Sequence, residues 1–541
     1  MIQEPIVEYA TDLSDLLARA AIRFGDHVAL DPGTDGSSGQ RHVSRITYAS
    51  LNSRAVTAAA RLREAGLVPG DRVALCAPGS PDWVVAFFGA VAAGLVPLLV
   101  SPRLTEANVA GLVNIAKPKA AIVPSARGAS GPGDPPTNEA TCALTSSMRY
   151  LLVEDLAAPA TPIETPLRGI AAHDADSAAV LVFTSGTTGT PRAVELTHRN
   201  LLSNVRSLLA VRRVTPSDSM LAMLSPSEPF ALTAGLLAPL SCGARVVFTI
   251  PLPPNRLLEL CRREEITHTL LVPALVELLV REVLDDLHAS PSSAPAPAAP
   301  ERTTSALRER LGPQFRHLAV GGAALDPALA ALLAGSGFEV DVGYGLAEAS
   351  PIVAVGSLAT TPRGSVGRPL PGVTVAVSEA GEILVRGPNV MPRYVDDSEA
   401  TAVALRDGWL HTGDSGVVDP DGFVFVLGRI KEIMVTPSGQ TIHPEEVEPF
   451  YASTLFAEHC VAGIPDASGN DIPTLFLVPT DRETCVQALS REVRSLRASA
   501  PPRARIEGWV LVDRALPRTA LGKIRRRQLA AQWCDERREV A

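Results

Sequence analysis

Between Ile46 and Val355, short apolar runs of the 541-residue chain alternate with longer amphipathic stretches. Four such pairs, each an apolar run with the helical stretch that follows it, are 178–183 with 198–210, 244–250 with 255–264, 269–272 with 275–287, and 317–320 with 327–334. Strands that alternate with helices at this spacing favour parallel sheets covered on both faces. We therefore predict an α/β fold whose large N-terminal domain has mainly parallel αβ-layered sheets.

After residue 363 the pattern changes to short strands separated by Gly, Pro and Asp turns, at 373–377, 382–386 and 423–427. This texture indicates an antiparallel portion, which we expect to be a small β-barrel-like subdomain. From Glu445 to the end, strand and helix patterns alternate again. We predict two domains, 1–428 and 429–541, the second a small α+β domain.

Three segments differ in composition from the rest of the chain. Residues 125–147 and 289–305 are rich in Pro, Ala, Ser, Gly and Thr, which predicts solvated surface insertions. Residues 83–100 carry no charge and are long enough to resemble a membrane span. Because Gly94 and Pro97 interrupt them, we predict a buried helix at 83–93 and a buried strand at 95–100. No transmembrane segment is therefore expected, and peripheral membrane contact stays open.

Composition bears on the cellular location of the protein and on the partners it can bind. The first sixteen residues are acidic and do not form a signal peptide, and seven cysteines without a CxxC pair suggest reduced thiols, so we expect a cytoplasmic protein. The chain has 49 basic and 58 acidic residues, a net charge of −9, and only 4% aromatic residues. Neither a basic excess nor stacking platforms are available, so we expect no nucleic-acid partner.

The sharpest motif is the sequence VLVFTSGTTGTPRA at 180–193. An apolar run ends in residues of only Thr, Ser and Gly, and a proline and a cation follow. Glycines let backbone N–H groups turn toward an anion, hydroxyls add donors, and the cation completes a cradle. Composition alone favours a phosphate site here over an ordinary flexible loop.

This segment resembles the phosphate loop of the adenylate-forming (AMP-binding) enzyme superfamily, most closely long-chain acyl-CoA synthetases and fatty acyl-AMP ligases. Four further segments resemble the superfamily's other signatures in the same order. They are GYGLAE at 343–348, GWLHTGD at 408–414, GRIKE at 428–432 continuing to HPEE at 443–446, and LPRTALGKI at 516–524. Any one alone is weak, but five in order between residues 178 and 529 are specific.

The resemblance implies ATP-dependent activation of a carboxylic acid, of medium or long chain, to an acyl-adenylate with release of pyrophosphate. Transfer to the thiol of coenzyme A would follow. An alternative is an acyl-AMP ligase that loads an acyl carrier protein or another nucleophile in a biosynthetic pathway. The implied cofactors are ATP, Mg²⁺ and coenzyme A, or the phosphopantetheine of a carrier protein, and the implied substrate is a small-molecule carboxylic acid.

The resemblance also assigns catalytic roles. Lys523 would neutralise the carboxylate and α-phosphate as charge develops, Glu348 would hold Mg²⁺, and Arg192 would complete the phosphate cradle. Only four of the 49 basic residues are lysines, so a lysine at this motif position is informative. Residues 429–541 would form a mobile lid that rotates about the hinge Lys431, with Gly439 lining the thiol tunnel.

The remaining implied site residues bind the nucleotide or the acid. Tyr344 would stack on adenine, and Asp414 with Arg429 would bind the ribose. The full nucleotide set is Thr184, Ser185, Gly186, Thr187, Thr188, Gly189, Gly322, Ala323, Tyr344, Gly345, Ala347, Asp414 and Arg429, and the acyl pocket is Glu228, Phe230 and Gly321.

The chain departs from the superfamily's pattern at a few positions. Arg192 and Ala193 replace the usual Lys-Gly, and Ala347 replaces the usual Thr, as in fatty acyl-AMP ligases. Glu228 stands where acyl-CoA synthetases usually have a His or aromatic gate. It could meet a polar or cationic group of the substrate or close the pocket differently, and the sequence leaves both open.

Overall fold

The computed structural model describes residues 5–33, 45–102, 104, 106–125, 148–158, 173–184, 192–249, 252–289, 300–436, 441–466, 470–481, 483–518 and 524–540. The chain divides into two compact units. The first comprises residues 1–184, 191–374 and 385–410, and the second comprises 185–190, 375–384 and 411–541. The mixed α/β fold with parallel-containing sheets confirms the predicted fold class. The domain boundary at 428 and the rotation about Lys431 stay predictions.

The first unit contains a seven-stranded sheet of order β18-β8-β7-β4-β3-β5-β6. Its strands from β7 to β6 pair in parallel, whereas β8 and β18 are antiparallel. The bounds are β3 Arg72–Leu75, β4 Val96–Leu99, β5 Ala120–Val123, β6 Arg149–Leu152, β7 Ala178–Thr184, β8 Arg192–Thr197 and β18 Arg393–Tyr394.

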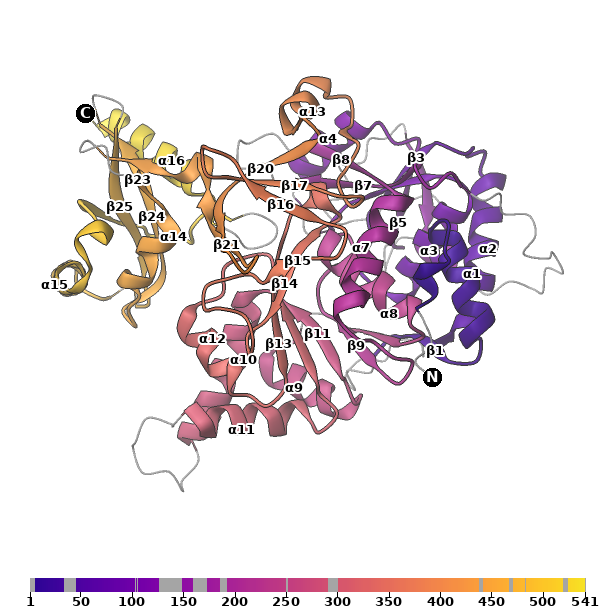
Figure 1. Cartoon of the computed structure of the whole chain (residues 1–541), viewed down its shortest axis with the longest axis horizontal. Coiled ribbons are helices and arrows are strands. Elements are labelled where there is room, and N and C mark those ends of the chain that lie inside the picture. The colour runs from indigo at the N-terminus through magenta and orange to yellow at the C-terminus, as the bar shows by residue number, and fades with distance from the viewer. Residues whose placement is uncertain are drawn as a thin grey trace. The chain divides into compact units, whose positions relative to one another are not determined.

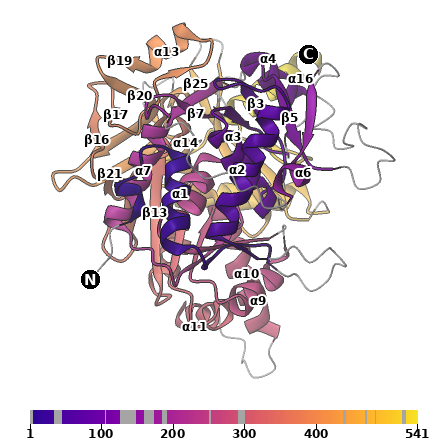
Figure 2. The same ribbon diagram turned by 90° about the vertical axis from the view of Figure 1, so that its right-hand side faces the viewer.

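Three N-terminal helices of this unit, α1 (Leu13–Phe24), α2 (Tyr48–Glu64) and α3 (Pro81–Ala92), pack against one another (Figure 2). Helix α3 begins where the Ser80 hydroxyl accepts the Trp83 N–H and Pro81 supplies a helical φ. It is apolar on nearly every side because nearly every side is buried, and β4 follows it as predicted. None of the helices in the described ranges is long and apolar enough to cross a membrane.

The second sheet of this unit has nine strands in the order β15-β14-β13-β12-β11-β9-β10-β1-β2. The six strands from β13 to β1 are parallel, and β14, β15 and β2 are antiparallel. The bounds are β1 Val28–Asp31, β2 Ile46–Thr47, β9 Ser219–Ala222, β10 Arg245–Phe248, β11 His268–Leu271, β12 His317–Val320, β13 Glu339–Gly345, β14 Ile352–Ser357 and β15 Arg368–Pro369.

Helices α9 (Pro254–Arg263), α10 (Pro273–Ala289) and α11 (Pro300–Leu311) lie together beside this sheet (Figure 1). Their apolar faces share one core with Leu318 and Val340 of the strands. The remaining helices in the described part of the unit are α4 Glu106–Ala116, α6 Val153–Ala157, α7 His198–Val211, α8 Ala238–Ser241, α12 Pro327–Ala334 and α13 Ser398–Ala404, with the short helices η1 Ile6–Glu8 and η4 Ala347–Ala349 and the π-helix η3 Ala231–Leu237.

The predicted strands and helices agree with these bounds within two residues at their described ends. One expectation was wrong: the insertion at 289–305 is too long, because residues 300–305 belong to α11. Pro300 supplies a helical φ at the first position, and Leu307 and Leu311 bury the helix against the core. Residues 290–299 and most of the insertion at 125–147 lie outside the described residues.

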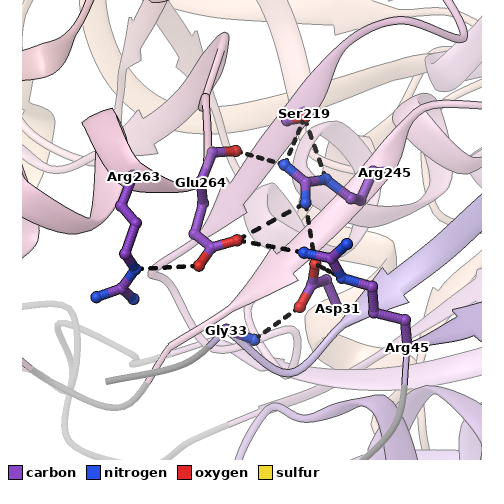
Figure 3. Close-up of polar contacts among 7 residues, drawn as sticks. All are labelled: Asp31, Gly33, Arg45, Ser219, Arg245, Arg263 and Glu264. Atoms are coloured by element: carbon purple, nitrogen blue, oxygen red, sulfur yellow. Dashed lines mark hydrogen bonds and ion pairs between the residues drawn. The ribbon is translucent and has the colours of Figure 1, made fainter. Parts of the chain in front are cut away.

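An ion-pair network joins β1, β10 and the end of α9 (Figure 3). The Asp31 carboxylate, 3% exposed, lies 2.9 Å from Arg245 Nη1 and 2.8 Å from Arg45 Nε. Glu264 Oε2 is 3.8 Å from the same Arg245 nitrogen, and Glu264 Oε1 is 3.2 Å from Arg263 Nε. Each buried carboxylate is thus compensated by at least one arginine, so neither leaves an unpaired buried charge.

A histidine pair lies at the amino ends of β11 and β12. His268 and His317 are register partners whose ring centroids are 5.3 Å apart. His317 Nε2 is 2.7 Å from Asp341 Oδ2, and Asp341 Oδ1 also accepts a hydrogen bond from Arg212 Nη2 at 2.8 Å. His268 is 7% exposed, and its Nδ1 is 2.7 Å from the Thr267 hydroxyl.

The second unit holds most of a five-stranded sheet of order β16-β17-β20-β19, with β21 paired to β20, and a three-stranded sheet of order β24-β25-β26. The strand bounds are β16 Thr374–Val377, β17 Glu382–Arg386, β19 Leu405–Arg406, β20 Trp409–Val418, β21 Val424–Arg429, β22 Met434–Val435, β23 Thr441–Ile442, β24 Phe456–Pro465, β25 Asp471–Pro479 and β26 Gly508–Leu511. The helices are η5 Ile430–Glu432, α14 Pro444–Val447, η6 Glu448–Tyr451, α15 Val486–Ser499, η7 Pro502–Ala504 and α16 Arg526–Val540.

Candidate active site

The first group of predicted site residues follows the carboxyl ends of parallel strands β12 and β13. Gly321 and Gly322 come directly after β12, and Tyr344 and Gly345 end β13. Gly322 has a φ of 86°, which favours glycine, and the Gly321 N–H donates to Leu271 O at 3.2 Å. In open α/β sheets ligands bind beyond the carboxyl ends of the strands, so this edge is a suitable place for a site.

Gly345 permits a close backbone approach. A Cβ at this position would lie 1.9 Å from Pro351 O, and the Leu346 N–H donates to the same oxygen at 2.9 Å. Any larger residue would push apart the tight turn that carries Ala347 and Glu348. The glycine is therefore needed for the position of Glu348, whatever it contacts itself.

Buried amide and hydroxyl groups hold the segment around Glu348 in place. Asn389 Nδ2 donates to Ala349 O at 2.8 Å, and Thr233 Oγ1 donates to Ser350 O at 2.8 Å. Asn204 of α7 bonds both the N–H and the C=O of Ile352, at 3.1 and 2.7 Å. Because these groups are almost fully buried, breaking any of the bonds would leave an unsatisfied polar group.

Tyr394 connects two of the predicted catalytic residues. Its hydroxyl donates to Glu348 Oε1 at 2.8 Å, and the Arg192 guanidinium lies 5.4 Å from the centre of its ring. Arg192 Nε is also 3.4 Å from Asp397 Oδ2. Across strands β7 and β8, Arg192 pairs in register with Thr184. A carboxylate, a cation and Thr184, the first threonine of the predicted phosphate loop, therefore belong to one neighbourhood.

The Glu348 carboxylate fits a role as a magnesium ligand. Mg²⁺ is usually held by one or two carboxylates together with substrate phosphates and water, rather than by an all-protein cage. In the described part of the chain no group of three or more His, Cys, Asp or Glu residues could hold a metal by itself. Glu348 is half-buried and one of its carboxylate oxygens is fixed by Tyr394, which suits a magnesium ion held by a single protein carboxylate together with phosphates and water.

The predicted acyl-pocket residues Gly321 and Phe230 are in contact. A Cβ at Gly321 would lie 3.2 Å from Phe230 Cε1, so any larger residue at this position would force the phenyl ring to move. Glu228 precedes the π-helix η3, and its C=O accepts the Leu232 N–H at 2.9 Å. Long π-helices are rare and often occur at functional sites.

An apolar pocket lies between η3 and strands β9, β10 and β11. Its lining residues are all apolar, and they are Leu221, Ala222, Met223, Leu224, Pro226, Ala231, Gly235, Leu236, Val246, Phe248 and Leu270. Three of them come from the 224–230 segment or the start of η3, next to Glu228 and Phe230. The pocket offers no side-chain hydrogen-bond partner, and its free space is only about 10 Å³, enough for about one water-sized group.

The second unit brings together the predicted ribose residues. Asp414 on β20 and Arg429 on β21 are register partners, and Asp414 Oδ1 is 2.9 Å from Arg429 Nε. Arg429 Nη1 also donates to Thr412 O at 3.1 Å, and the Asp414 N–H donates to Thr412 Oγ1 at 3.1 Å. Asp414 is 5% exposed, so its carboxylate is held in one orientation.

Several of the predicted site residues take no part in the contacts described above. Lys431 is exposed in η5, one residue before the buried Glu432. Ser185, Gly186, Thr187, Thr188, Gly189, Gly439 and Lys523 lie outside the described residues. Their roles stay predictions.

Sequence reasoning missed four residues that position Glu348: Tyr394, Asn389, Asn204 and Thr233. For Asn204 a signal was available, because asparagine is unfavourable inside a helix and its place in α7 needs a reason. Tyr394 gave no such signal. Its pairing with Val194 of β8 brings it near Glu348, and a contact of this sequence separation cannot be seen in local patterns.

Known proteins resemble the chain over most of its length. The family described as AMP-binding enzyme matches residues 17–395. The chain belongs to this family. A feruloyl-CoA synthase from Amycolatopsis sp is 32% identical over 452 residues, covering 81% of this chain and 84% of that protein. A 3-[(3aS,4S,7aS)-7a-methyl-1,5-dioxo-octahydro-1H-inden-4-yl]propanoyl:CoA ligase from Mycobacterium tuberculosis is 31% identical, covering 90% and 93%.

The fold of this AMP-binding enzyme also resembles a solved structure. An o-succinylbenzoate CoA synthetase from Bacillus subtilis, in complex with an acyl-adenylate intermediate, aligns with a TM-score of 0.77 at 22% identity, covering 95% of this chain and 97% of that one. The predicted superfamily is therefore confirmed, and so is the class of enzyme, an AMP-forming acid–thiol ligase.

Proposed function

We propose that this AMP-binding enzyme activates a hydrophobic carboxylic acid with ATP and Mg²⁺ and transfers the acyl group from its adenylate to the thiol of coenzyme A. The observation that carries the proposal is the contact of Tyr394 with both Glu348 and Arg192. Joining a carboxylate to the α-phosphate of ATP brings two anions together, so a fixed cation and a metal-binding carboxylate are the groups required.

In this proposal each residue has one role. Glu348 would hold Mg²⁺, which supplies charge neutralisation on the phosphate oxygens. Arg192, with the threonines and glycines of the phosphate loop, would bind the phosphates. Asp414 and Arg429 would bind the ribose, and Lys523 would place an ammonium group against the developing charge during adenylation.

The apolar pocket supports a hydrophobic acid. All of its lining side chains are apolar, and its free space is about 10 Å³, so an alkyl chain or ring would bury apolar surface there only if lining side chains moved aside. The two curated relatives are named for a feruloyl group and for a bicyclic propanoyl group, so acids of different shapes occur among similar proteins. We propose a medium or long acyl chain for this enzyme.

A carrier-protein thiol is the second candidate acceptor. Ala347, next to Glu348, offers no hydroxyl, and this feature is shared with fatty acyl-AMP ligases. The two acceptors differ in whether free coenzyme A is consumed.

Exchange of labelled pyrophosphate into ATP, measured with a panel of fatty and aromatic acids, tests the proposal. We expect exchange with hydrophobic acids and acyl-CoA formation when coenzyme A is added. Exchange without consumption of coenzyme A would favour the carrier protein, and no exchange with any acid would contradict adenylation. Lys523→Ala should abolish exchange and spare thioester formation from supplied acyl-AMP.

A further inference from the structure

Arg526, the first residue of α16, is surrounded by three carboxylates. Its Nη1 lies 2.8 Å from Glu432 Oε2 and 3.1 Å from Glu445 Oε1. Its Nε and Nη2 donate to the two oxygens of Glu448 at 3.1 and 2.8 Å. The arginine is 7% exposed, so a single buried guanidinium joins three acidic residues from three short helices.

These carboxylates belong to the segments that follow the predicted hinge. Glu432 is the residue after Lys431 in η5, Glu445 lies in α14, and Glu448 begins η6. Glu448 Oε1 also accepts the Val461 N–H at 2.8 Å, which fixes it to β24. A Cβ at Gly428, before the hinge, would lie 2.5 Å from Glu445 Oε2, so this carboxylate also packs against the end of β21.

In the chain, Arg526 comes directly after residues 524–525, which pair with residues 517–518 on the other side of the segment that contains Lys523. The Arg525 N–H donates to Pro517 O at 2.7 Å, and Arg518 and Ile524 form an antiparallel bridge. Arg518 Nη2 is 2.6 Å from Glu458 Oε2 on β24. Arg518 is therefore held to β24, the strand that Glu448 of the Arg526 cluster also contacts, and Ile524 is held to Arg518.

The charges in this cluster do not favour a purely stabilising role. One arginine and three carboxylates sum to −2, and buried ion pairs often contribute no more stability than apolar residues of similar size. The planar guanidinium instead fixes the relative positions of its partners, because its N–H groups bind the three carboxylates in fixed directions.

We propose that Arg526 is a positioning residue for adenylation. It joins helix η5, which bears Lys431, to the residues that flank the segment containing Lys523, so that the two parts move as one body. The inference rests on the proposed function, in which Lys523 acts in adenylation and not in thioester formation. Arg526 itself touches neither substrate nor reacting atoms.

The test uses Arg526→Lys, which keeps the charge and loses the fork, and Glu432→Gln, which removes one negative charge from the cluster. Matched controls are Arg527→Gln and Glu507→Gln at exposed positions of the same unit. For each full-length variant we would measure kcat and KM for pyrophosphate exchange, thioester formation from supplied acyl-AMP, and the melting temperature.

We expect kcat for exchange to fall about 100-fold in Arg526→Lys and about 10-fold in Glu432→Gln, because misplacing a catalytic group by about 1 Å costs on the order of 10²-fold. KM for ATP and thioester formation from acyl-AMP should stay within about twofold of wild type. Glu432→Gln should melt no lower than wild type, since it relieves like-charge repulsion. Both controls should behave as wild type.

Wild-type exchange in both variants would overturn the inference. So would an equal fall in both half-reactions that follows a lower melting temperature, because that pattern reports a structural role. Absence of exchange in the wild-type enzyme, or full exchange in Lys523→Ala, would instead overturn the proposed function and the inference with it.

Discussion

Tyr394 donates its phenolic hydrogen to Glu348 over 2.8 Å, and its ring lies against the Arg192 guanidinium. An aromatic residue on the two-residue strand β18 thus connects a carboxylate and a cation that are 156 residues apart in the sequence (348 − 192). The hydrogen bond restricts the carboxylate to one orientation and leaves its second oxygen for a cation.

Replacing Tyr394 by Phe should keep the fold and slow adenylation. The variant loses one hydrogen bond to a charged group, which is worth about 1.5–3 kcal/mol and corresponds to about a 10-fold or larger fall in kcat for pyrophosphate exchange. The Mg²⁺ concentration for half-maximal rate should rise. Tyr9→Phe, at a position 57% exposed, is the matched control, and an unchanged Mg²⁺ dependence in Tyr394→Phe would contradict the assigned contact.

Gly345→Ala should be strongly destabilising and inactive. The added methyl would lie 1.9 Å from Pro351 O, a backbone atom that cannot move away as a flexible side chain could. We expect a loss of about 1–3 kcal/mol or more in the free energy of unfolding, measured by urea denaturation. Gly364→Ala is a less crowded comparison, with no neighbour within 4 Å of the new methyl, although its φ of 83° adds strain. Equal stability of Gly345→Ala and wild type would refute the close approach.

Asp414→Asn should weaken nucleotide binding more than folding. The variant removes the charge of the ion pair with Arg429, whose side chain is 30% exposed, so water compensates much of the loss in stability. KM for ATP should rise about 10-fold, in line with the loss of a charge-assisted hydrogen bond. Asp421→Asn, in the exposed turn of the same hairpin, should have no effect. Unaltered ATP saturation in Asp414→Asn would argue against ribose binding.

Stability should fall as the pH falls from about 6.5 to about 4. Burial, together with the neighbouring His317 and Arg316, lowers the pKa of His268 to about 4, although Asp218 opposes the shift. In the unfolded chain a histidine has a pKa near ~6.5, so in this window the unfolded state binds more protons and gains in population. Burial also lowers the pKa of His198 to about 4, and its Nδ1 accepts the Leu13 N–H at 3.3 Å.

Melting curves between pH 4 and 8 test this dependence. Because protonating a histidine whose pKa is lowered to about 4 destabilises the folded state by on the order of a few kcal/mol, His268→Gln should remove that acid-induced loss and flatten the curve at low pH. The exposed His27→Gln serves as the control and should leave the slope unchanged. An acid slope in His268→Gln as steep as that of wild type would disprove the assignment.

Local patterns predicted the elements well and the contacts between them poorly. The strands and helices around 178–211 and 317–334 were predictable because apolar periodicity and glycine or proline boundaries are local signals. The motifs selected Glu348, Asp414 and Arg429 as site residues, and their roles stay predictions. They also assigned Phe230 and Gly321 to one pocket, and these two residues do lie together. The helical start at Pro300 was missed because a proline- and alanine-rich composition masks a helix whose stability comes from packing against the core.

Residues that act over long sequence separations could not be predicted. Tyr394, Asn389 and Thr233 are ordinary strand, loop and helix residues until the chain is folded around the Glu348 turn. Their roles follow from burial, which makes each hydrogen bond obligatory, and burial of a polar side chain has no reliable local signature.

The histidine pair and the glycines that follow β12 lie at opposite ends of the same parallel strands, with His317 four to five residues before the glycines, or about 13–17 Å. We therefore expect acid tolerance and turnover to be separable. Replacing the imidazoles would change the pH dependence of stability and leave the opposite edge of the sheet, which carries the proposed site glycines, untouched.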